Sequence, residues 1–422
     1  MQNYTEVHVT KLANDGAGYR PQPMTTRSPS RRLWQPPGRF EDRDPNRSVT
    51  FLELFFDLVF VAVIAQLAHR LAEHPSWEGV GWFVFLFYAV WSSWINGTLY
   101  HDLHSTNDLS IRAFTFAQML AVALMAVHAG DVPGDGTNGF AIGYAANTFV
   151  LVVLWFRTGL HDRNHRPASV PYSIAYLISA ALFGVSVLVE PPLTYWMWAA
   201  ALLVELGGFA FAMYRFTPPG SQDGEAVIAT TPSLIERMGL FVIIVLGEVV
   251  VGSVNGMAEL TPLDLDGGVI GLSGVLIAIG LWWLYFDLVS HRAPLSRFTQ
   301  VWLYLHLPLV IAIAAGGAGV LTTIENSASP LPDAVRWLLV GSLAVAVLSV
   351  VALTLVLEIR STTEEIGTVY RVADRAASMS VLLIIAVGIT TWGAKATLLV
   401  LVALLLLPVY AGLRVWSRTG TA

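Results

Sequence analysis

From Thr50 onward, the chain alternates between long apolar runs and short polar segments. Each run is about 17 to 25 residues long, and a helix needs about 20 such residues to cross the hydrocarbon layer of a bilayer. The pattern predicts twelve spans, at approximately 50–69, 80–104, 111–129, 139–157, 171–189, 193–214, 233–254, 267–289, 298–320, 334–357, 374–392 and 396–415. Because backbone groups in lipid must be bonded within their own segment, each run is read as a helix, and the alternation typical of a membrane barrel is absent. The predicted fold class is therefore an all-α polytopic membrane protein.

Composition supports this prediction. Hydrophobic residues make up 55% of the chain and charged residues only 13%, which does not fit a soluble domain. A formal net charge of -6 leaves no basic face for a nucleic-acid partner. The absence of cysteine excludes disulfides, thiolate metal sites and a cysteine nucleophile. The lipid bilayer is the predicted partner and a small molecule or lipid a candidate ligand, whereas the sequence indicates no metal, cofactor or oligomeric state.

Cationic residues give the predicted topology. Residues 1–47 contain no apolar run and no cleavable signal pattern, and we expect a disordered cytoplasmic tail. With twelve spans, 21 of the 24 Lys and Arg residues fall on the side of the termini, and only Arg70, Arg336 and Lys395 fall on the other. The positive-inside bias then predicts a plasma (inner) membrane protein with both termini in the cytoplasm.

Short segments recur along the chain at a nearly constant offset. Tyr-His-Asp-Leu at 100–103, followed by Arg112, recurs as Tyr-Phe-Asp-Leu at 285–288, followed by Arg297, with every position offset by 185. The first span of each half also opens with Thr/Ser-x-x-Glu, offset by 183. This pattern indicates an internal repeat of six spans.

The repeat defines the predicted domains. They are a tail over 1–47, a first six-helix repeat over 48–216, a cytoplasmic linker over 217–231, a second six-helix repeat over 232–417 and a cytoplasmic C-terminal tail over 418–422. Six crossings return the chain to its starting side. The two repeats should therefore run in the same sense, related by an axis along the membrane normal.

Ionisable residues within the spans are the candidate site residues. An ionisable group at mid-membrane costs at least about 2.5 to 3.5 kcal/mol on insertion scales, so each needs a partner or a function. Asp57 lies nearly two turns into the first span, among aromatic residues. For Glu53 and Glu236 two interpretations stay open: a functional carboxylate, or a capping box in which the glutamate bonds the amide of Thr50 or Ser233.

Further candidates lie deeper or beside these acids. Glu248 follows Glu236 by twelve residues, about 18 Å along a helix axis, which places it near the bilayer centre. We expect it to pair with a cation or to carry a proton, and Gly247 and Gly252 to let a neighbouring helix approach. The same depth is predicted for His306 and Glu205. Arg237 is a candidate for binding a carboxylate or a substrate anion.

The repeated acids and bases near the cytoplasmic ends are interpreted differently. Asp102, Arg112, Asp287 and Arg297 occupy matched positions, which favours salt bridges between helices over a binding role. Four histidines in the same regions are expected to be solvated: His101, His104, His161 and His165. The chain contains no Walker loop, dinucleotide glycine pattern, H-E-x-x-H helix or G-x-S-x-G elbow.

Two segments carry a family resemblance. Phe-Leu-Glu-Leu-Phe-Phe-Asp-Leu-Val-Phe-Val at 51–61 and Glu-Arg-x-Gly-Leu-Phe-x-Ile-Ile-Val-Leu-Gly-Glu at 236–248 resemble the bacterial low temperature requirement A (LtrA) family, over about 50–415. The resemblance implies a polytopic plasma-membrane protein linked by name to growth in the cold, and hence to a stress response, without an established substrate. Family members often have a histidine three residues before the second motif, where this chain has Ser233.

Three functional hypotheses follow. The first is a proton-coupled secondary transporter of a small or anionic solute, in which Asp57 and Glu248 exchange protons and Arg237 binds the anion. The second is an integral-membrane enzyme acting on a lipid or apolar substrate, with Glu53, Asp57, Glu248 and His306 as acid/base groups or metal ligands. The third is a membrane scaffold or sensor without turnover.

Overall fold

The structure is a computed structural model of the 422-residue chain. It describes residues 33–39, 47–104, 106, 108–215, 231–260, 265–290, 292–295, 298–326, 331–357 and 364–419, without the side chains of 213–215, 364–370, 412, 415, 416, 418 and 419. Some predicted features lie outside the described residues. They are Arg297 of the predicted salt bridges, residues 217–230 of the linker, and residues 1–32 and 40–46 of the tail.

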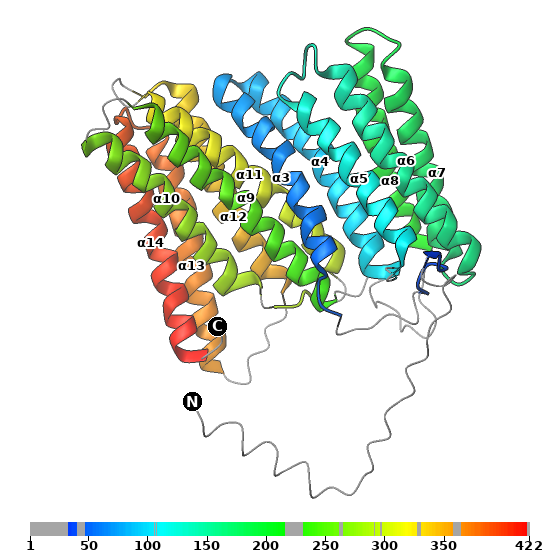
Figure 1. Ribbon diagram of the computed structural model, residues 1–422. Helices are drawn as coiled ribbons and strands as arrows, with labels where there is room; N and C mark the ends of the chain where they lie inside the picture. Colours follow the sequence, from blue (N-terminus) through cyan, green and yellow to red (C-terminus); the bar gives the residue numbers. More distant parts are fainter. Residues whose placement is uncertain are drawn as a thin grey trace, which may run out of the picture.

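The described residues form twelve long α-helices, each overlapping one predicted span, which lie side by side (Figure 1). They are α3 (Phe51–Glu73), α4 (Trp77–His104), α5 (Leu109–Ala129), α6 (Thr137–His161), α7 (Arg166–Ser186), α8 (Leu193–Arg215), α9 (Pro232–Glu259), α10 (Leu265–Tyr285), α11 (Thr299–Glu325), α12 (Asp333–Val356), α13 (Glu364–Val387) and α14 (Ala394–Thr419). A π-helical turn, η2 (Phe286–Ser290), continues α10.

Several helices are longer than their apolar runs. The largest difference is α13, which begins at Glu364, ten residues before the predicted start at 374. Charged residues occupy this added segment in the sequence. A hydropathy pattern detects only the part of a helix that suits lipid, so a helix that continues beyond that part is predicted too short.

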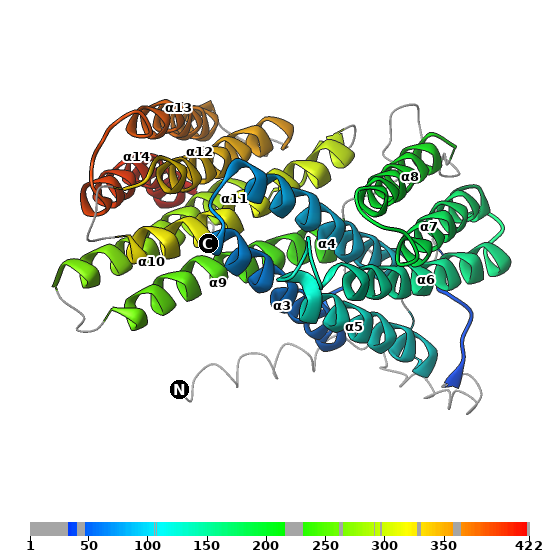
Figure 2. The same ribbon diagram turned by 90° about the horizontal axis from the view of Figure 1, so that it is seen from above.

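The helices pack in two groups, joined by a central set. Seen from above, α5–α8 lie at one side of the molecule, α10 and α12–α14 lie at the other, and α3, α4, α9 and α11 lie between them (Figure 2). The contacts that join the groups are those of α3 and α4 with α9 and α11. Residues on these four helices therefore decide how the halves of the chain are held together.

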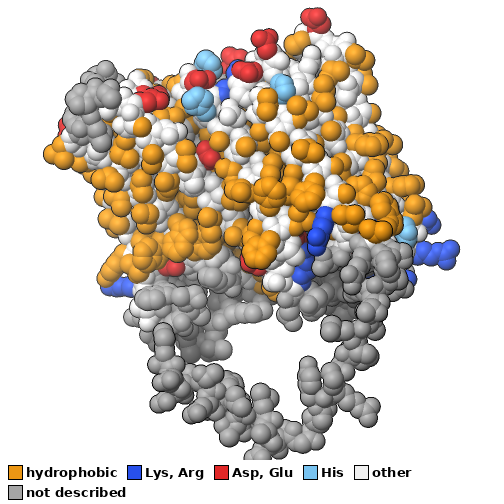
Figure 3. Space-filling model, viewed as in Figure 1, with side chains coloured by type: hydrophobic (Ala, Val, Ile, Leu, Met, Phe, Trp, Pro, Cys, Tyr) orange, Lys and Arg blue, Asp and Glu red, His pale blue; other side chains and the backbone are white. Residues whose placement is uncertain are grey.

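The outer surface suits lipid. Hydrophobic side chains cover the middle of the face shown in Figure 3, with acidic side chains gathered at its upper end and cationic ones at its lower end. Nine described helices are long and apolar enough to cross a membrane: α3, α5, α6, α7, α8, α10 with η2, α11, α12 and α14. The fold is therefore that of a polytopic helical membrane protein in contact with the bilayer.

The α4 helix has the most enclosed position. Every residue from Ala89 to His104 is buried, so this half of the helix is covered by protein on all sides. Packing against protein rather than lipid explains why it tolerates polar residues such as Ser92, Ser93 and Asn96. It supplies side chains to both of the polar clusters described below.

The α9 and α11 helices approach each other closely through glycine. A Cβ atom at Gly252 would lie 2.8 Å from the carbonyl oxygen of Gly317, and one at Gly317 would lie 3.0 Å from the backbone of Glu248. The expected close approach at Gly252 is thus present. Gly247 has no such neighbour, since a Cβ there would meet nothing within 4 Å.

Candidate functional site

The site begins where α3 begins. The hydroxyl of Thr50 accepts a hydrogen bond from the Glu53 amide at 3.4 Å, and the Glu53 carboxylate accepts one from the Thr50 amide at 2.9 Å. This reciprocal arrangement is the capping box that the sequence offered as one interpretation of Glu53. It also fixes the Glu53 carboxylate at the end of the helix, with one oxygen left for other partners.

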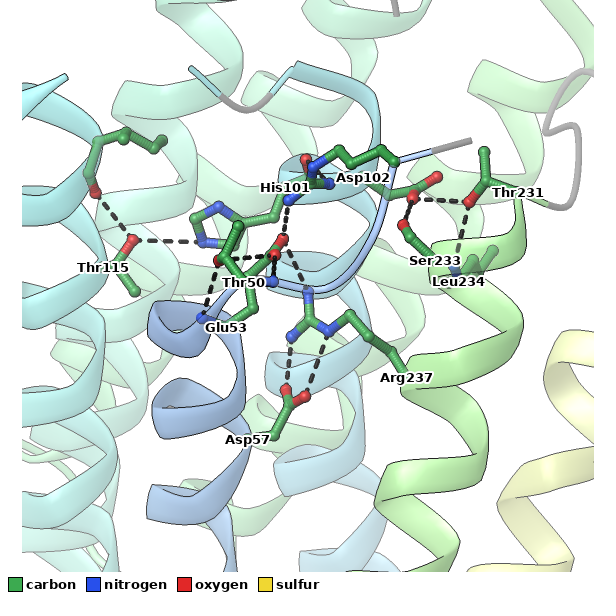
Figure 4. Close-up of polar contacts among 12 residues, drawn as sticks. Thr50, Glu53, Asp57, His101, Asp102, Thr115, Thr231, Ser233, Leu234 and Arg237 are labelled. Carbon is green, nitrogen blue, oxygen red and sulfur yellow. Dashed lines mark hydrogen bonds and ion pairs between the residues drawn. The ribbon is translucent and has the colours of Figure 1, made fainter. Parts of the chain in front are cut away.

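Asp57 and Arg237 form a two-bond ion pair across the interface between α3 and α9 (Figure 4). The Nη2 atom of Arg237 donates to Oδ1 of Asp57 at 2.5 Å, and Nε donates to Oδ2 at 3.2 Å. Both side chains are only 1% exposed. The indole Nε1 of Trp94 on α4 donates a third bond to Asp57, at 2.8 Å. Three helices therefore converge on one carboxylate.

Glu53 extends the pair into a network of four charges. Its Oε1 atom lies 3.8 Å from Nη1 of Arg237 and accepts a bond from Arg47, whose side chain precedes α3. Arg47 also donates to the carbonyl of His101 at 3.1 Å. Two carboxylates and two guanidinium groups balance each other. Because a buried charge is stable only when compensated, each of these residues depends on the others.

Aromatic rings enclose the ion pair. The ring of Phe241, one turn beyond Arg237 on α9, stacks on Trp94 with centroids 3.9 Å apart. The guanidinium carbon of Arg237 lies 5.8 Å from the ring centroid of Phe56. Such walls exclude water and strengthen the electrostatic attraction between Asp57 and Arg237.

Asp102 holds the beginning of α9. It accepts hydrogen bonds from the hydroxyls of Thr231, at 2.7 Å, and of Ser233 (Figure 4). A carboxylate at a helix N-terminus also interacts favourably with the helix dipole. The salt-bridge interpretation did not identify these hydroxyl partners, which belong to the opposite half of the chain.

The predicted cap of the second half was misplaced by two residues. The N-cap of α9 is Thr231, whose hydroxyl accepts from the Leu234 amide, and the first helical residue is Pro232. Proline suits this first position because its fixed φ matches the helix and its missing N–H is not needed there. Ser233 is therefore inside the helix and free to bond Asp102, while Glu236 is exposed and takes no part in the network.

A pocket leads from the helix ends toward the network. Its volume is about 520 Å³, and its lining includes Arg47, Thr50, Glu53, His101 and Arg112. A second polar pocket, of about 260 Å³, lies at the opposite end of α3; its lining includes Arg70, His74 and Glu78. Both pockets involve α3 and α4, and the buried middle of α3 separates them.

Glu248 lies above the ion pair on the same face of α9. Eleven residues separate it from Arg237, which corresponds to about three turns and about 16 Å. Its side chain is 8% exposed, and no hydrogen bond or ion pair joins it to another residue in the described part of the chain. Of the two alternatives that the sequence offers for Glu248, a cationic partner is not found among these residues.

The other deep candidates are separated from this network. His306 Nδ1 donates to the Trp302 carbonyl at 2.8 Å, which leaves Nε2 to accept from the Tyr285 hydroxyl at 3.0 Å. It precedes Gly317, which packs on Glu248, by eleven residues, so the two side chains are not at the same depth as predicted. Glu205 binds hydroxyl groups within the first half. Across the described ranges, no three His, Asp or Glu side chains are placed to hold a metal ion.

A family comparison connects these observations. The model of the bacterial low temperature requirement A protein (LtrA) matches residues 48–415. The chain belongs to the LtrA family. An uncharacterised protein of Rhizobium meliloti (strain 1021) is 29% identical to it over 300 residues, which cover 67% of this chain and 70% of that protein. No solved structure matches the chain.

The two segments that carry the LtrA resemblance meet in the structure. Asp57 belongs to the first segment, at 51–61, and Arg237 to the second, at 236–248. Their ion pair joins segments 180 residues apart in the chain. The place where LtrA family members often have histidine is occupied here by Ser233, which bonds Asp102.

The remaining predicted salt-bridge residues lie near the ends of helices. Arg112 is exposed and lines the 520 Å³ pocket at the beginning of α3. Asp287 is half-buried in the π-helical turn η2. These positions are near helix ends, but their residue types do not determine their partners.

The prediction of solvated histidines was wrong for three of the four. His101, His104 and His165 are 2%, 1% and 3% exposed, whereas His161 is exposed. His104 and His165 stack edge-on with centroids 4.6 Å apart. Burial, reinforced by the neighbouring His104, lowers the pKa of His165 to about 2. These rings are covered because α4 extends to His104 and the loops fold over its end.

A short segment of the N-terminal tail supplies part of this cover. The ring of Trp34 lies over the guanidinium of Arg157, with the ring centroid 4.3 Å from the guanidinium carbon. The Gly38 amide donates to the His104 carbonyl at 3.2 Å, and Nδ1 of His104 lies 2.8 Å from the Gly38 carbonyl oxygen. The Gln35 amide donates to Asp108 at 2.9 Å. Burial acts to raise the pKa of Asp108, but this amide and nearby hydroxyls outweigh it and hold the pKa below its ordinary value.

Several residues of the network were not predicted. From the sequence, Arg47 enters only the count of cations on the side of the termini, and Trp94 is not singled out. A usable signal existed for α4, because a run of Ser92, Ser93 and Asn96 inside a predicted span already indicates protein contact on that face.

Proposed function

We propose that this LtrA protein is a proton-coupled secondary transporter of a small anionic solute. The observation that carries the proposal is the buried Asp57–Arg237 pair, which joins the two halves of the chain beside a pocket open at one end. An anion entering that pocket meets Arg47 and Arg112 at the rim and Arg237 behind Glu53. Arg237 is held by the carboxylates of Glu53 and Asp57, which a solute anion can replace, so it is suited to release one anion and bind another.

Competition for Arg237 gives a physical basis for coupling. If a solute carboxylate replaces Asp57 at Arg237, the released Asp57 becomes a buried charge without a partner, at a cost of about 3 to 5 kcal/mol. Taking up a proton removes that cost. Anion binding and proton uptake are therefore linked, one proton for each anion. Loss of the ion pair also loosens the contact between α3 and α9.

Glu248 is the second proton carrier in this proposal. It lies on the Arg237 face of α9, about 16 Å further along, where α11 packs closely through Gly317. A carboxyl with no ion-pair partner among the described residues avoids the cost of a buried charge by carrying a proton. It is placed between the level of the ion pair and the opposite end of the helix.

The proposal includes twelve crossings. The three helices not among the nine apolar ones, α4, α9 and α13, have 28, 28 and 24 residues, long enough to span the hydrocarbon layer. Protein contact allows α4 to carry Ser92, Ser93 and Asn96, and α9 carries Glu236, Arg237 and Glu248. Each then returns the chain to the face at which the preceding helix begins.

We also propose two parallel six-helix repeats, over 48–216 and 232–417, with 217–231 as a linker. Many equivalent helices make equivalent contacts: α3 packs on α4 and α5 as α9 packs on α10 and α11, and the series α5 to α8 matches the series α11 to α14, although the packing of α10 on α14 exceeds that of α4 on α8. The beginnings of α3 and α9 lie at the same end of the molecule (Figure 1). This supports an axis along the membrane normal.

The cationic residues support a cytoplasmic location for this end. The 21 Lys and Arg residues that the topology places on the side of both termini include Arg47, Arg112 and Arg237. The pocket lined by Arg47 and Arg112, and with it the tail over 1–47, would then face the cytoplasm. A link to growth in the cold rests on the family name, and loss of growth at low temperature in a deletion strain would test it.

Proton flux in liposomes tests the transport proposal. The purified chain is reconstituted with a trapped pH-sensitive dye, and gradients of lactate, succinate or glutamate are imposed in turn. We expect at least one anion to drive proton movement faster than in protein-free liposomes. Arg237→Gln and Glu248→Gln should each abolish the excess flux. Glu236→Gln is the matched control, because Glu236 is exposed and adjoins Arg237 in the chain.

Two results would contradict the proposal at different points. Wild-type flux equal to that of empty liposomes for every anion would remove transport of this class. Unchanged flux in Glu248→Gln would remove the second proton carrier but leave Arg237 as the anion site.

A scaffold or sensor without turnover is the second candidate. The pocket that lies between the halves, of about 720 Å³, is bordered mainly by apolar side chains, including Trp77, Phe83, Ile311 and Trp337. Both polar pockets involve α3 and α4 instead. An apolar contact between the halves favours a fixed assembly, and absence of flux for all anions would support this candidate.

A further inference from the structure

A second buried carboxyl lies in the core of the first half, away from the ion pair. Glu205 is on α8, about midway along the helix, and is 5% exposed. It contacts α4 through Ser92, whereas the ion pair contacts the same helix through Trp94. Two residues apart on a helix correspond to a rotation of about 200°, so the two carboxyls lie on opposite sides of α4.

Three hydroxyl groups from three other helices surround Glu205. Ser92 of α4 donates to Oε2 at 2.7 Å, and Ser179 of α7 donates to Oε1 at 2.5 Å. The phenol of Tyr144 on α6 lies 3.1 Å from Oε1 and 3.0 Å from Oε2. Asn96 donates to the Ser92 oxygen at 3.2 Å, which leaves the Ser92 hydrogen for Glu205. Four helices thus share one closed polar cluster.

No cationic side chain in the described part of the chain lies within ion-pair distance of Glu205. The titratable groups that face it are the phenols of Tyr88 on α4, Tyr144 on α6, Tyr176 on α7 and Tyr304 on α11. Phenols are neutral at physiological pH. The positive charge that compensates the carboxylate must therefore come from outside the set of described side chains.

Hydrogen bonds alone do not remove this requirement. Each hydrogen bond from a hydroxyl stabilises the carboxylate, but its negative charge remains buried without a compensating positive charge. A carboxylate with hydroxyl oxygens is the kind of ligand set that hard cations bind. The same hydroxyls can accept a hydrogen from a protonated carboxyl, since each carries lone pairs as well as a hydrogen.

We propose that Glu205, with Ser92, Ser179 and Tyr144, binds a small monovalent cation, a proton or a sodium ion, in the core of the first half. The bound cation neutralises the carboxylate and lets the four helices pack around it. The site does not depend on anion transport or on the Asp57–Arg237 pair. Removing the cation would leave an uncompensated charge where α4, α6, α7 and α8 meet.

Unfolding equilibria of the full chain in mixed detergent micelles test this site. Wild type and Glu205→Gln are compared over a range of pH, in sodium chloride or choline chloride at equal ionic strength. The glutamine side chain has the same shape and is neutral without a cation. The comparison therefore measures how much cation binding at Glu205 contributes to the free energy of unfolding.

The two cation sources give different results, and both support the proposal. If Glu205 holds a proton, unfolding releases it above the ordinary pKa of glutamate. The wild-type unfolding constant then rises about tenfold per pH unit relative to Glu205→Gln. If it holds sodium, sodium chloride stabilises the wild type over choline chloride and has no such effect on Glu205→Gln. The proposal is overturned if wild type shows neither difference.

A ligand variant keeps the test usable should Glu205→Gln fail to fold. Ser179→Ala removes one oxygen and retains the carboxyl, so the sodium effect should weaken or the pH dependence should move. The matched pair on α4 is Ser92→Ala, which removes a ligand, and Ser93→Ala, which removes a buried hydroxyl that does not contact Glu205. If wild type shows the sodium effect, an equal effect in Ser179→Ala and Ser92→Ala would also overturn the assignment of these hydroxyls as ligands.

Discussion

Breaking the Asp57–Arg237 pair should destabilise the protein more through Arg237 than through Asp57. In Arg237→Met, two buried carboxylates lose their shared partner, because Glu53 lies 3.8 Å and Asp57 2.5 Å from the guanidinium. Removing one member of a buried pair costs about 3 to 5 kcal/mol, and we expect the upper part of this range. In Asp57→Asn, Arg237 keeps Glu53 and the Trp94 indole keeps an acceptor, so about 3 kcal/mol is expected.

The double variant gives the sharper measurement. Asp57→Asn with Arg237→Met leaves no buried charge at this position except Glu53, which retains Arg47. The loss in the double variant should therefore be smaller than the sum of the single losses, with a coupling energy of about 2 to 3 kcal/mol. The assay is the free energy of unfolding in mixed micelles, followed by tryptophan fluorescence and circular dichroism.

An exposed ion pair between two helices provides the control. Lys395 and Asp266 are 47% and 61% exposed and join α14 to α10 at 2.5 Å. Because solvent screens such a pair, the same cycle with Asp266→Asn and Lys395→Met should give a coupling below about 1 kcal/mol. Equal coupling in the two cycles, or additive losses at Asp57 and Arg237, would refute the view that this buried pair holds the halves together.

Three further predictions concern other parts of the structure. Trp34→Ala removes the contact with Arg157, worth about 0.5 to 1 kcal/mol, and should speed tryptic cleavage of the tail about two- to fivefold with little change in melting temperature; an unchanged cleavage rate would contradict it. Gly252→Val places a side chain against an α11 carbonyl 2.8 Å away and should cost about 1 to 3 kcal/mol, whereas Gly247→Val should be nearly neutral in the same unfolding assay. The pKa of His165 is about 2 in the folded protein, so only the unfolded chain binds its proton as the pH falls through its ordinary value of 6.5, and stability should fall by up to about 1.4 kcal/mol per pH unit below that value. Melting curves at decreasing pH should show a smaller loss in His165→Asn, and equal losses would show that the ring titrates in the folded state.

The elements of this fold are predictable because lipid imposes a simple length and polarity rule. Each of the twelve apolar runs overlaps a helix, and the capping box of Thr50 and Glu53 is present as its spacing indicates. Capping depends on neighbours in the chain, so it can be inferred from local sequence. It fails at Ser233 because Pro232 moves the helix start to Thr231.

The partners of buried polar groups are not predictable in the same way. The sequence places Arg237 and Asp57 at similar depths, but helix faces are fixed only when α3, α4 and α9 pack together. Glu205 illustrates this most clearly, because its ligands are Ser92, Tyr144 and Ser179, residue types that occur in many apolar helices. A hydroxyl can bond its own helix backbone or a neighbour, and only the fold selects between them.

The burial of the histidines shows a different limit. The sequence predicts solvated rings for His101 and His104 near the end of the span over 80–104, yet both are buried in α4. A segment of the tail then covers His104 through Gly38. Hydropathy describes the match between a helix and lipid, so it cannot detect a helix end covered by a distant part of the same chain.

The two helices that organise the candidate sites also explain why apolar character alone is a poor guide to them. α4 and α9 are not among the nine described helices that qualify as membrane spans by length and composition, although α4 contacts both buried carboxyls and α9 supplies Arg237 and Glu248. A helix that faces lipid must exclude polar residues, whereas one enclosed by protein can carry them when partners are available. Polar and charged residues inside a helix of full membrane length are therefore a signal of enclosure, and in this chain they identify the helices on which substitutions should alter function rather than insertion.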